Sequence, residues 1–185
     1  MALDLYIFNF LNSFAGQSRI WDAIFVFMAS DLAIIIPAAV VLWIAFEKHE
    51  LHKQIQMLLI VSAAAVLSRF IITEIIRNFY NRPRPFDVSE VNLLFQHEGY
   101  GSFPSGHSTF FFAIATAVYL YNKKWGIVFF AATFLMTLSR VIAGIHWPSD
   151  ILGGMAIGVI SAYLMFYVSK KIKPPLKPGK ISEGI

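Results

Sequence analysis

Apolar runs occupy most of this 185-residue chain, and they limit its possible folds more than any other feature. Hydrophobic residues make up 57% of the sequence and charged residues only 14%, whereas a soluble domain carries about 25% charged residues. Several runs approach or exceed the length that crosses a hydrocarbon core of about 30 Å. They cover roughly residues 20–46, 56–76, 108–121, 125–141 and 151–168. The sequence therefore predicts an all-α, polytopic transmembrane helix bundle of about five to six spans.

The two ends of the chain differ from these runs. Residues 3–14 are apolar but too few to cross a bilayer, which predicts a short N-terminal interfacial helix. Asp31 and Pro37 interrupt the first run, so a kink or a split is expected at the aspartate. The last residues, 174–185, are rich in lysine and proline and predict a cytoplasmic tail. Residues 1–173 are then expected to form a single membrane-embedded domain.

The positive charges indicate how the chain crosses the membrane. All the lysines lie in three places: after the first run, after the third run and after the last run. With five crossings these places share one side, and the positive-inside rule makes that side cytoplasmic. The net charge of +4 is explained by this topology, so no nucleic-acid partner is predicted. The chain has no cysteine, which excludes thiol catalysis and thiolate metal sites.

Three polar clusters lie at the opposite ends of the runs from the lysines. They are RNFYNRPRP at 77–85, PSGH at 104–107 and SRVIAGIHWPSD at 139–150. The topology places all three at one depth, on the face away from the cytoplasm. Arginine suits the bidentate recognition of phosphate or carboxylate better than lysine does, and these clusters hold most of the arginines. The clusters therefore predict an anion site on the outer face of the membrane.

The chemistry of the clusters supports an anion site. Ser105 is a good N-cap, and the backbone amides of Gly106 and His107 at a helix start would bind an anion. Charge-assisted hydrogen bonds around that anion are expected from three arginines: Arg77, Arg84 and Arg140. A further cation, Arg82, would suit a second phosphate or act as an interfacial anchor.

A histidine–aspartate pair supplies a nucleophile. His146 and Asp150 are four residues apart, and Pro148 between them suits a first helical turn. The carboxylate is therefore expected to orient the imidazole and raise its nucleophilicity. His107 lies beside the anion site and is the natural acid for a leaving oxygen. A single interfacial histidine is more often a capping residue, but three clusters on one face favour an active site.

These motifs resemble the signature of the type 2 phosphatidic-acid phosphatase superfamily of membrane lipid phosphatases. That signature reads Lys-x6-Arg-Pro, then Pro-Ser-Gly-His, then Ser-Arg-x5-His-x3-Asp. Residues 104–107 and 139–150 match the second and third parts, whereas Arg77 stands where the first part has lysine. This difference keeps the positive charge but changes the geometry of the side chain.

The resemblance implies a metal-independent hydrolysis through a phosphohistidine, with no cofactor. It assigns the nucleophile to His146, the orienting carboxylate to Asp150 and the leaving-group acid to His107. Phosphate binding is implied for five residues: Arg77, Arg84, Ser105, Gly106 and Arg140. Three more are candidates for supporting roles: Glu74, Arg82 and Ser139.

The substrate is expected to be a phospholipid or a polyprenyl diphosphate presented at the outer face of the cell membrane. In its short N-terminal helix and its small size, the chain resembles the bacterial undecaprenyl-diphosphate phosphatases linked to bacitracin resistance. Those enzymes often carry aspartate where Gly106 stands here. Undecaprenyl diphosphate is therefore the expected substrate. The alternatives are phosphatidylglycerophosphate, phosphatidic acid, diacylglycerol pyrophosphate and a lipid phosphotransferase reaction. A non-catalytic binder or transporter is disfavoured, because His107, His146 and Asp150 are all present.

The sequence also predicts the contacts or exposure of a few residues outside the three clusters. Arg69, Glu74 and Asp31 lie in or near the apolar runs, and charges buried in membranes are usually paired, so either acid is expected to partner an arginine near the site. His97 is expected to be a surface residue, with contact to the lipid headgroup as the alternative. The glycines of the pair at 154 and 158 are expected to permit close helix packing.

Overall fold

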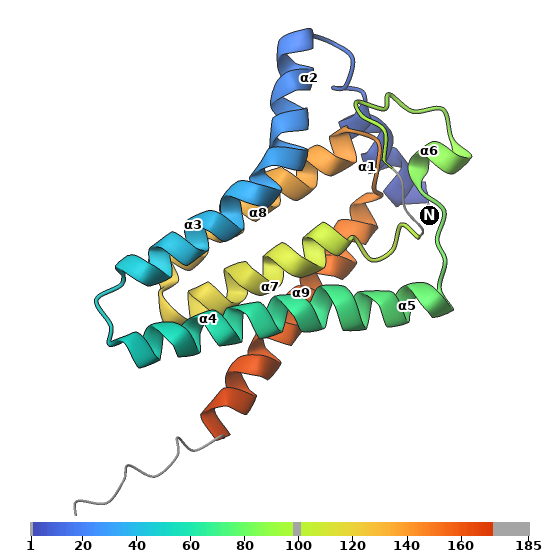
Figure 1. The fold of residues 1–185 in the computed structure, drawn as a ribbon. Coiled ribbons are helices and arrows are strands. Elements are labelled where there is room, and N and C mark those ends of the chain that lie inside the picture. The colour runs from blue at the N-terminus through green and yellow to red at the C-terminus, as the bar shows by residue number, and fades with distance from the viewer. Residues whose placement is uncertain (1, 98–100, 172–185) are drawn as a thin grey trace, which may run out of the picture.

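The computed structural model describes residues 2–97 and 101–171, and all regular structure within these ranges is helical. Figure 1 shows long helices packed side by side, with the short helices α1 and α6 gathered at one end. In chain order the elements are α1 (Ala2–Asn12), α2 (Arg19–Val26), η1 (Phe27–Asp31), α3 (Leu32–Phe46), α4 (Leu51–Val66), η2 (Leu67–Ile72), α5 (Thr73–Phe79), α6 (Pro85–Val88), α7 (Gly106–Tyr121), α8 (Lys123–Ile142) and α9 (Pro148–Lys171).

Two of the long helices each contain a π-helical segment. The helix of α2, η1 and α3 runs from Arg19 to Phe46, and the helix of α4, η2 and α5 runs from Leu51 to Phe79. The interruption predicted at Asp31 takes the form of η1, a wider turn rather than a break, and the helix continues through Pro37. The predicted N-terminal interfacial helix is α1.

Each predicted apolar run forms a long helix. Within the described residues, four helices have the length and apolar character of a membrane span: Arg19–Phe46, Leu51–Phe79, Lys123–Ile142 and Pro148–Lys171. The helix from the third run, α7, has 16 residues and packs against α4, α8 and α9 at the centre of the bundle (Figure 1). Large apolar side chains cover the outside, among them Ile34, Phe46 and Ile160. This arrangement confirms the predicted membrane helix bundle.

Close packing of α9 on α7 fixes the centre of the bundle. A β-carbon at Gly158 would lie 2.5 Å from the carbonyl oxygen of Thr109 and 2.8 Å from the amide nitrogen of Ala113. A β-carbon at Gly154 would lie 2.6 Å from the β-carbon of Ser108. Only glycine allows this approach, so the expected close packing at this glycine pair is confirmed.

The polar clusters and the lysines lie at opposite ends of the bundle. The end of α5, helix α6 and the starts of α7 and α9 come together at one end, and the α3–α4 and α7–α8 connections lie at the other (Figure 1). The first of these ends carries the three polar clusters, and the second carries the loop lysines. The predicted tail, 174–185, lies outside the described residues.

Candidate active site

The third polar cluster folds around Asp150, in the first turn of α9. Its side chain is 0% exposed and accepts hydrogen bonds from the Trp147 amide at 2.8 Å, an Nη of Arg82 at 2.8 Å and the Ser102 hydroxyl. The same carboxylate oxygen that binds Trp147 lies 3.4 Å from Nδ1 of His146. Helix α9 begins at Pro148, where the missing N–H costs no hydrogen bond. The fold thus places the carboxylate against His146.

The two nitrogens of His146 face different partners. Nδ1 faces Asp150, and Nε2 lies 3.4 Å from an Nη of Arg84. The neutral tautomer with its proton on Nδ1 therefore directs the Nε2 lone pair toward Arg84. Complete burial lowers the pKa of His146 well below its ordinary value, and the positive charge of Arg84 lowers it further. A neutral imidazole is the form that attacks an electrophile.

Backbone carbonyls hold Arg84 in place. Its guanidinium donates to the carbonyl of Ile145 at 2.9 Å and to the carbonyl of Gly101 at 3.2 Å. Burial, followed by repulsion from Arg77, lowers the pKa of Arg84 to about 10. The side chain remains a cation at neutral pH and supplies positive charge directly beside Nε2 of the histidine.

The second polar cluster forms the start of α7 and is docked on α9. The Ser105 hydroxyl caps the helix by accepting from the Ser108 amide at 3.5 Å. The Ser105 amide donates to the backbone carbonyl of Asp150 at 3.1 Å, and the Ser108 hydroxyl donates to that of Ile151 at 2.7 Å. The positive end of the α7 dipole therefore lies beside the Asp150 turn, where a bound anion is favoured.

Two more arginines approach this place with unused donors. Arg77 donates to the carbonyl of Pro104 at 3.0 Å, and Arg140 donates to the carbonyl of Ala29 at 2.7 Å. In both side chains Nε is buried and has no hydrogen-bond partner within 2–97 and 101–171. A buried cationic donor without a partner is costly, and an oxyanion bound between these arginines would satisfy it.

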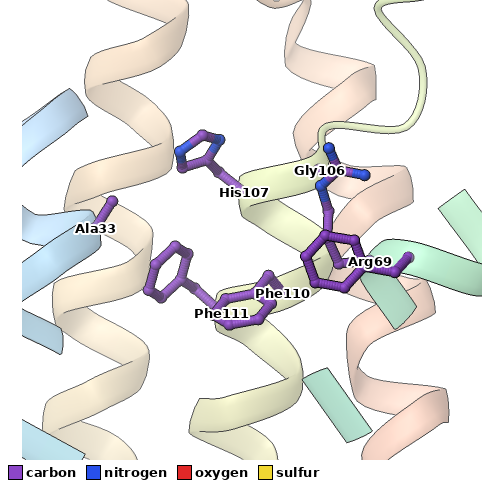
Figure 2. A pocket seen from close by; sticks show the side chains of 7 residues that line it. Ala33, Arg69, Gly106, His107, Phe110 and Phe111 are labelled. Atoms are coloured by element: carbon purple, nitrogen blue, oxygen red, sulfur yellow. The ribbon is translucent and has the colours of Figure 1, made fainter. Parts of the chain in front are cut away.

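His107 lies in the first turn of α7. It lines a cavity with Arg69 and Gly106, as Figure 2 shows. Arg140 and His146 lie close enough to His107 for electrostatic interaction. The fold therefore gathers both predicted histidines, the capped helix start and the three arginines Arg77, Arg84 and Arg140 in one region.

Arg82 is held by protein acceptors on both sides of its guanidinium. One Nη donates to Asp150 and to the Ser149 hydroxyl, and the other donates to Asp4 at 2.6 Å. The guanidinium also lies 5.3 Å from the centre of the Trp147 ring. Arg82 therefore links the interfacial helix α1 to the carboxylate behind His146.

The other supporting candidates have defined contacts. Glu74 lies 2.5 Å from Arg69 and 3.8 Å from Arg77, so its expected pairing with an arginine near the site is confirmed. The Ser139 hydroxyl donates to the carbonyl of Leu135, one turn back in α8. Asp31 has no ion pair among the described residues.

Three residues near the site were not predicted from the sequence: Ser102, Asp4 and His97. The His97 ring is half-buried, and its centre lies 6.4 Å from that of His146, so this loop residue lies closer to the predicted nucleophile than its sequence position indicates. Burial, followed by the charges of Arg84 and Arg140, lowers the pKa of His97 to about 4. No spacing in the sequence marks these positions, because they reach the site through loops and a separate helix.

The donor set of the site is cationic. Within the described ranges, no group of three histidine, aspartate or glutamate side chains is arranged to hold a metal ion. The buried carboxylate of Asp150 is already surrounded by protein donors. The groups available to an anion here are arginine side chains and the amides at the start of α7.

Comparison with known proteins identifies the family. The sequence matches the PAP2 superfamily over residues 56–174, which includes all three polar clusters. The chain belongs to the PAP2 superfamily.

Several known proteins resemble this chain over most of its length. The undecaprenyl-diphosphatase BcrC of Bacillus subtilis is 31% identical over 172 residues, which cover 91% of this chain and 85% of BcrC. A Bacillus licheniformis protein named bacitracin transport permease protein BcrC is 27% identical, over 92% of this chain and 82% of that protein. The crystal structure of Aquifex aeolicus LpxE superposes with a TM-score of 0.75 at 26% identity and covers 90% of this chain and 96% of LpxE.

The family match and the named relatives identify the kind of protein. This PAP2 protein is a membrane lipid phosphatase, a hydrolase acting on phosphorus-containing bonds. Its apolar helix bundle embeds it in a membrane, and its partners are lipid substrates.

Proposed function

We propose that this protein hydrolyses undecaprenyl diphosphate to undecaprenyl phosphate and inorganic phosphate through a phosphohistidine on His146. The observation that carries the proposal is the position of His146, with Nδ1 against Asp150 and Nε2 against Arg84. The substrate is supported by the activity for which the Bacillus subtilis relative is named. The intact nucleophile and acid set favours an enzyme over the transport role named for the Bacillus licheniformis relative.

In the first step Nε2 of His146 attacks the terminal phosphorus. A nitrogen–phosphorus bond forms, and the bond from that phosphorus to the bridging oxygen breaks. The protonated imidazole of His107 gives its proton to the departing lipid phosphate. Asp150 accepts a hydrogen bond from Nδ1–H of His146 and stabilises the positive charge that develops on the ring.

In the second step water hydrolyses the phosphoenzyme. The now neutral His107 takes a proton from the water, whose oxygen attacks the phosphorus. The nitrogen–phosphorus bond breaks, its electrons return to Nε2, and inorganic phosphate leaves. Five residues are proposed to stabilise the equatorial oxygens in both steps: Arg77, Arg84, Ser105, Gly106 and Arg140.

The active site is proposed to face outside the cytoplasm, with the C-terminus inside. The loop lysines lie at the end of the bundle opposite the polar clusters, and lysines favour the cytoplasmic side. An outward-facing site would act on the carrier lipid after it has delivered its cell-wall precursor, which links the activity to recycling of that lipid and to bacitracin resistance.

The test is phosphate release by the purified protein in the presence of EDTA. Undecaprenyl diphosphate, phosphatidylglycerophosphate and phosphatidic acid are compared at equal surface concentration in detergent micelles. The expected result is the highest kcat/KM for undecaprenyl diphosphate, with no loss on adding EDTA. A preference for either phospholipid would overturn the substrate, and a strict Mg²⁺ requirement would overturn the mechanism.

A further inference from the structure

Arg69 is a cation beside the site that the proposed mechanism does not use. It lies in η2, the π-helical segment of the second long helix. A β-carbon at Gly106 would lie 2.5 Å from Nε of Arg69 and 3.0 Å from its Cζ. The guanidinium therefore occupies the space that a side chain at the first residue of α7 would need. Figure 2 shows it directly beside Gly106.

A cavity connects Arg69 with the catalytic region. Its volume is about 220 Å³, and its polar end is formed by Arg69, Gly106 and His107. The rest of its wall is apolar: Ala33, Phe70, Phe110 and Phe111. Figure 2 shows Phe110 and Phe111 further along α7 from His107, below the level of the guanidinium.

This cavity reaches the lipid-facing surface of the bundle. Phe70 lines it and is 59% exposed, and the Arg69 side chain is 28% exposed. The wall combines α3, through Ala33, with η2 and α7. Binding sites for whole small molecules measure about 300–1,000 Å³, so this cavity suits one end of a lipid whose remaining chain lies in the bilayer.

The ion pair of Arg69 with Glu74 leaves the guanidinium available to a ligand. Glu74 is 47% exposed and lies 2.5 Å from Nη1 of Arg69. An exposed carboxylate is a weak competitor for an arginine, whereas a phosphate brings more charge and more acceptor oxygens. Glu74 also lies 3.8 Å from Arg77, so it retains a cationic neighbour if Arg69 turns to a phosphate.

A diphosphate substrate places a charged group at this position. In the proposed first step, His107 protonates the bridging oxygen, so the lipid-side phosphate must lie next to His107. Arg69 lines the same cavity as His107. That phosphate gains negative charge as the bridging bond breaks, and a neighbouring guanidinium would stabilise it. A lipid monophosphate has no second phosphate there.

We propose that Arg69 binds the lipid-side phosphate of a lipid diphosphate, and that the cavity walled by Phe70, Phe110 and Phe111 takes the first isoprene units of the same molecule. This inference rests on the proposed function. It makes Arg69 a specificity residue that favours diphosphates over monophosphates, and it gives Gly106 a role in leaving room for the guanidinium.

The test uses Arg69→Gln with two lipids of the same prenyl chain, the diphosphate and the monophosphate. The expected result is a fall of about 10- to 100-fold in kcat/KM for the diphosphate, as for the loss of one charge-assisted hydrogen bond, with the monophosphate value changed by less than about twofold. Arg69→Lys should recover part of the loss. Arg19→Gln, an exposed arginine in α2, is the matched control and should leave both values unchanged.

A single-turnover measurement separates binding from a folding defect. The second step contains no lipid phosphate, so Arg69→Gln should slow formation of the phosphoenzyme and leave its hydrolysis rate at the wild-type value. Equal losses on both lipids, no loss on either, or slowed hydrolysis would overturn this inference. Failure of the wild-type protein to hydrolyse undecaprenyl diphosphate would instead overturn the proposed function.

Discussion

The interfacial helix α1 is predicted to support catalysis through Asp4. Its carboxylate accepts from the Ser149 amide at 2.9 Å, from the Ser149 hydroxyl at 2.6 Å and from Arg82 at 2.6 Å. It therefore caps the start of α9 from another helix and anchors the arginine that holds Asp150. The change that tests this is Asp4→Asn, which removes the charge and nearly preserves the shape.

The magnitude follows from these contacts. The Asp4 and Arg82 side chains are only 15% and 16% exposed, so their contact is largely shielded from water. A hydrogen bond to a charged group contributes about 1.5–3 kcal/mol, and an anion at a helix start about 0.3–1 kcal/mol. We expect Asp4→Asn to destabilise the protein by about 2–4 kcal/mol. Because Asp150 becomes less firmly held, kcat should fall about tenfold, which corresponds to about 1.4 kcal/mol.

The assay combines steady-state kinetics with thermal unfolding in detergent. KM should stay within about twofold of wild type, because Asp4 contacts Arg82 and Ser149 and is proposed to have no contact with substrate. Asp22→Asn is the control, since among the described residues the Asp22 carboxylate accepts a hydrogen bond only from the Gly16 amide, which lies outside the site. If Asp4→Asn kept wild-type kcat and Tm, α1 would be a membrane anchor with no link to His146.

Two further predictions concern pH and packing. Burial lowers the pKa of His97 to about 4 from an ordinary 6.5, so the unfolded chain binds more protons than the native one between these values. Stability should therefore be lost as pH falls from about 6.5 toward 4, and His97→Gln should flatten the dependence of Tm on pH in that window. Gly158→Ala would place a methyl group against the α7 backbone and should destabilise the bundle by about 1–3 kcal/mol. Leu152→Ala, at an exposed position of α9, should shift Tm far less, and equal shifts would refute the packing argument.

Much of this architecture was predictable because membrane helices are specified locally. Each apolar run carries its own length and composition, and the positions of the lysines give their relative direction. The motif residues lie at the ends of these runs, and packing of the helices brings those ends together at one end of the bundle. Thus the contact of His146 with Asp150 and the capped start of α7 at Ser105 follow from spacing alone.

The remaining contacts depend on tertiary docking that no spacing encodes. Arg82 looked like a free cation in the sequence, but α1 brings Asp4 to one side of it and Asp150 lies on the other. Ser102 and His97 reach the site through the long connection between α5 and α7. The helix forms the π-helical turn η1 at Asp31 instead of breaking there, and no apolar periodicity in the sequence predicts such a turn.

His146 is proposed to be the residue that is phosphorylated during turnover. The most direct measurement is rapid quenching of the protein with undecaprenyl diphosphate labelled on its terminal phosphate, followed by peptide mapping of the acid-labile label. We expect transient labelling at position 146 with EDTA present, no labelling in His146→Ala, and accumulated label in His107→Ala if a good leaving group is supplied. Label on another residue, or turnover by His146→Ala near the wild-type rate, would contradict it.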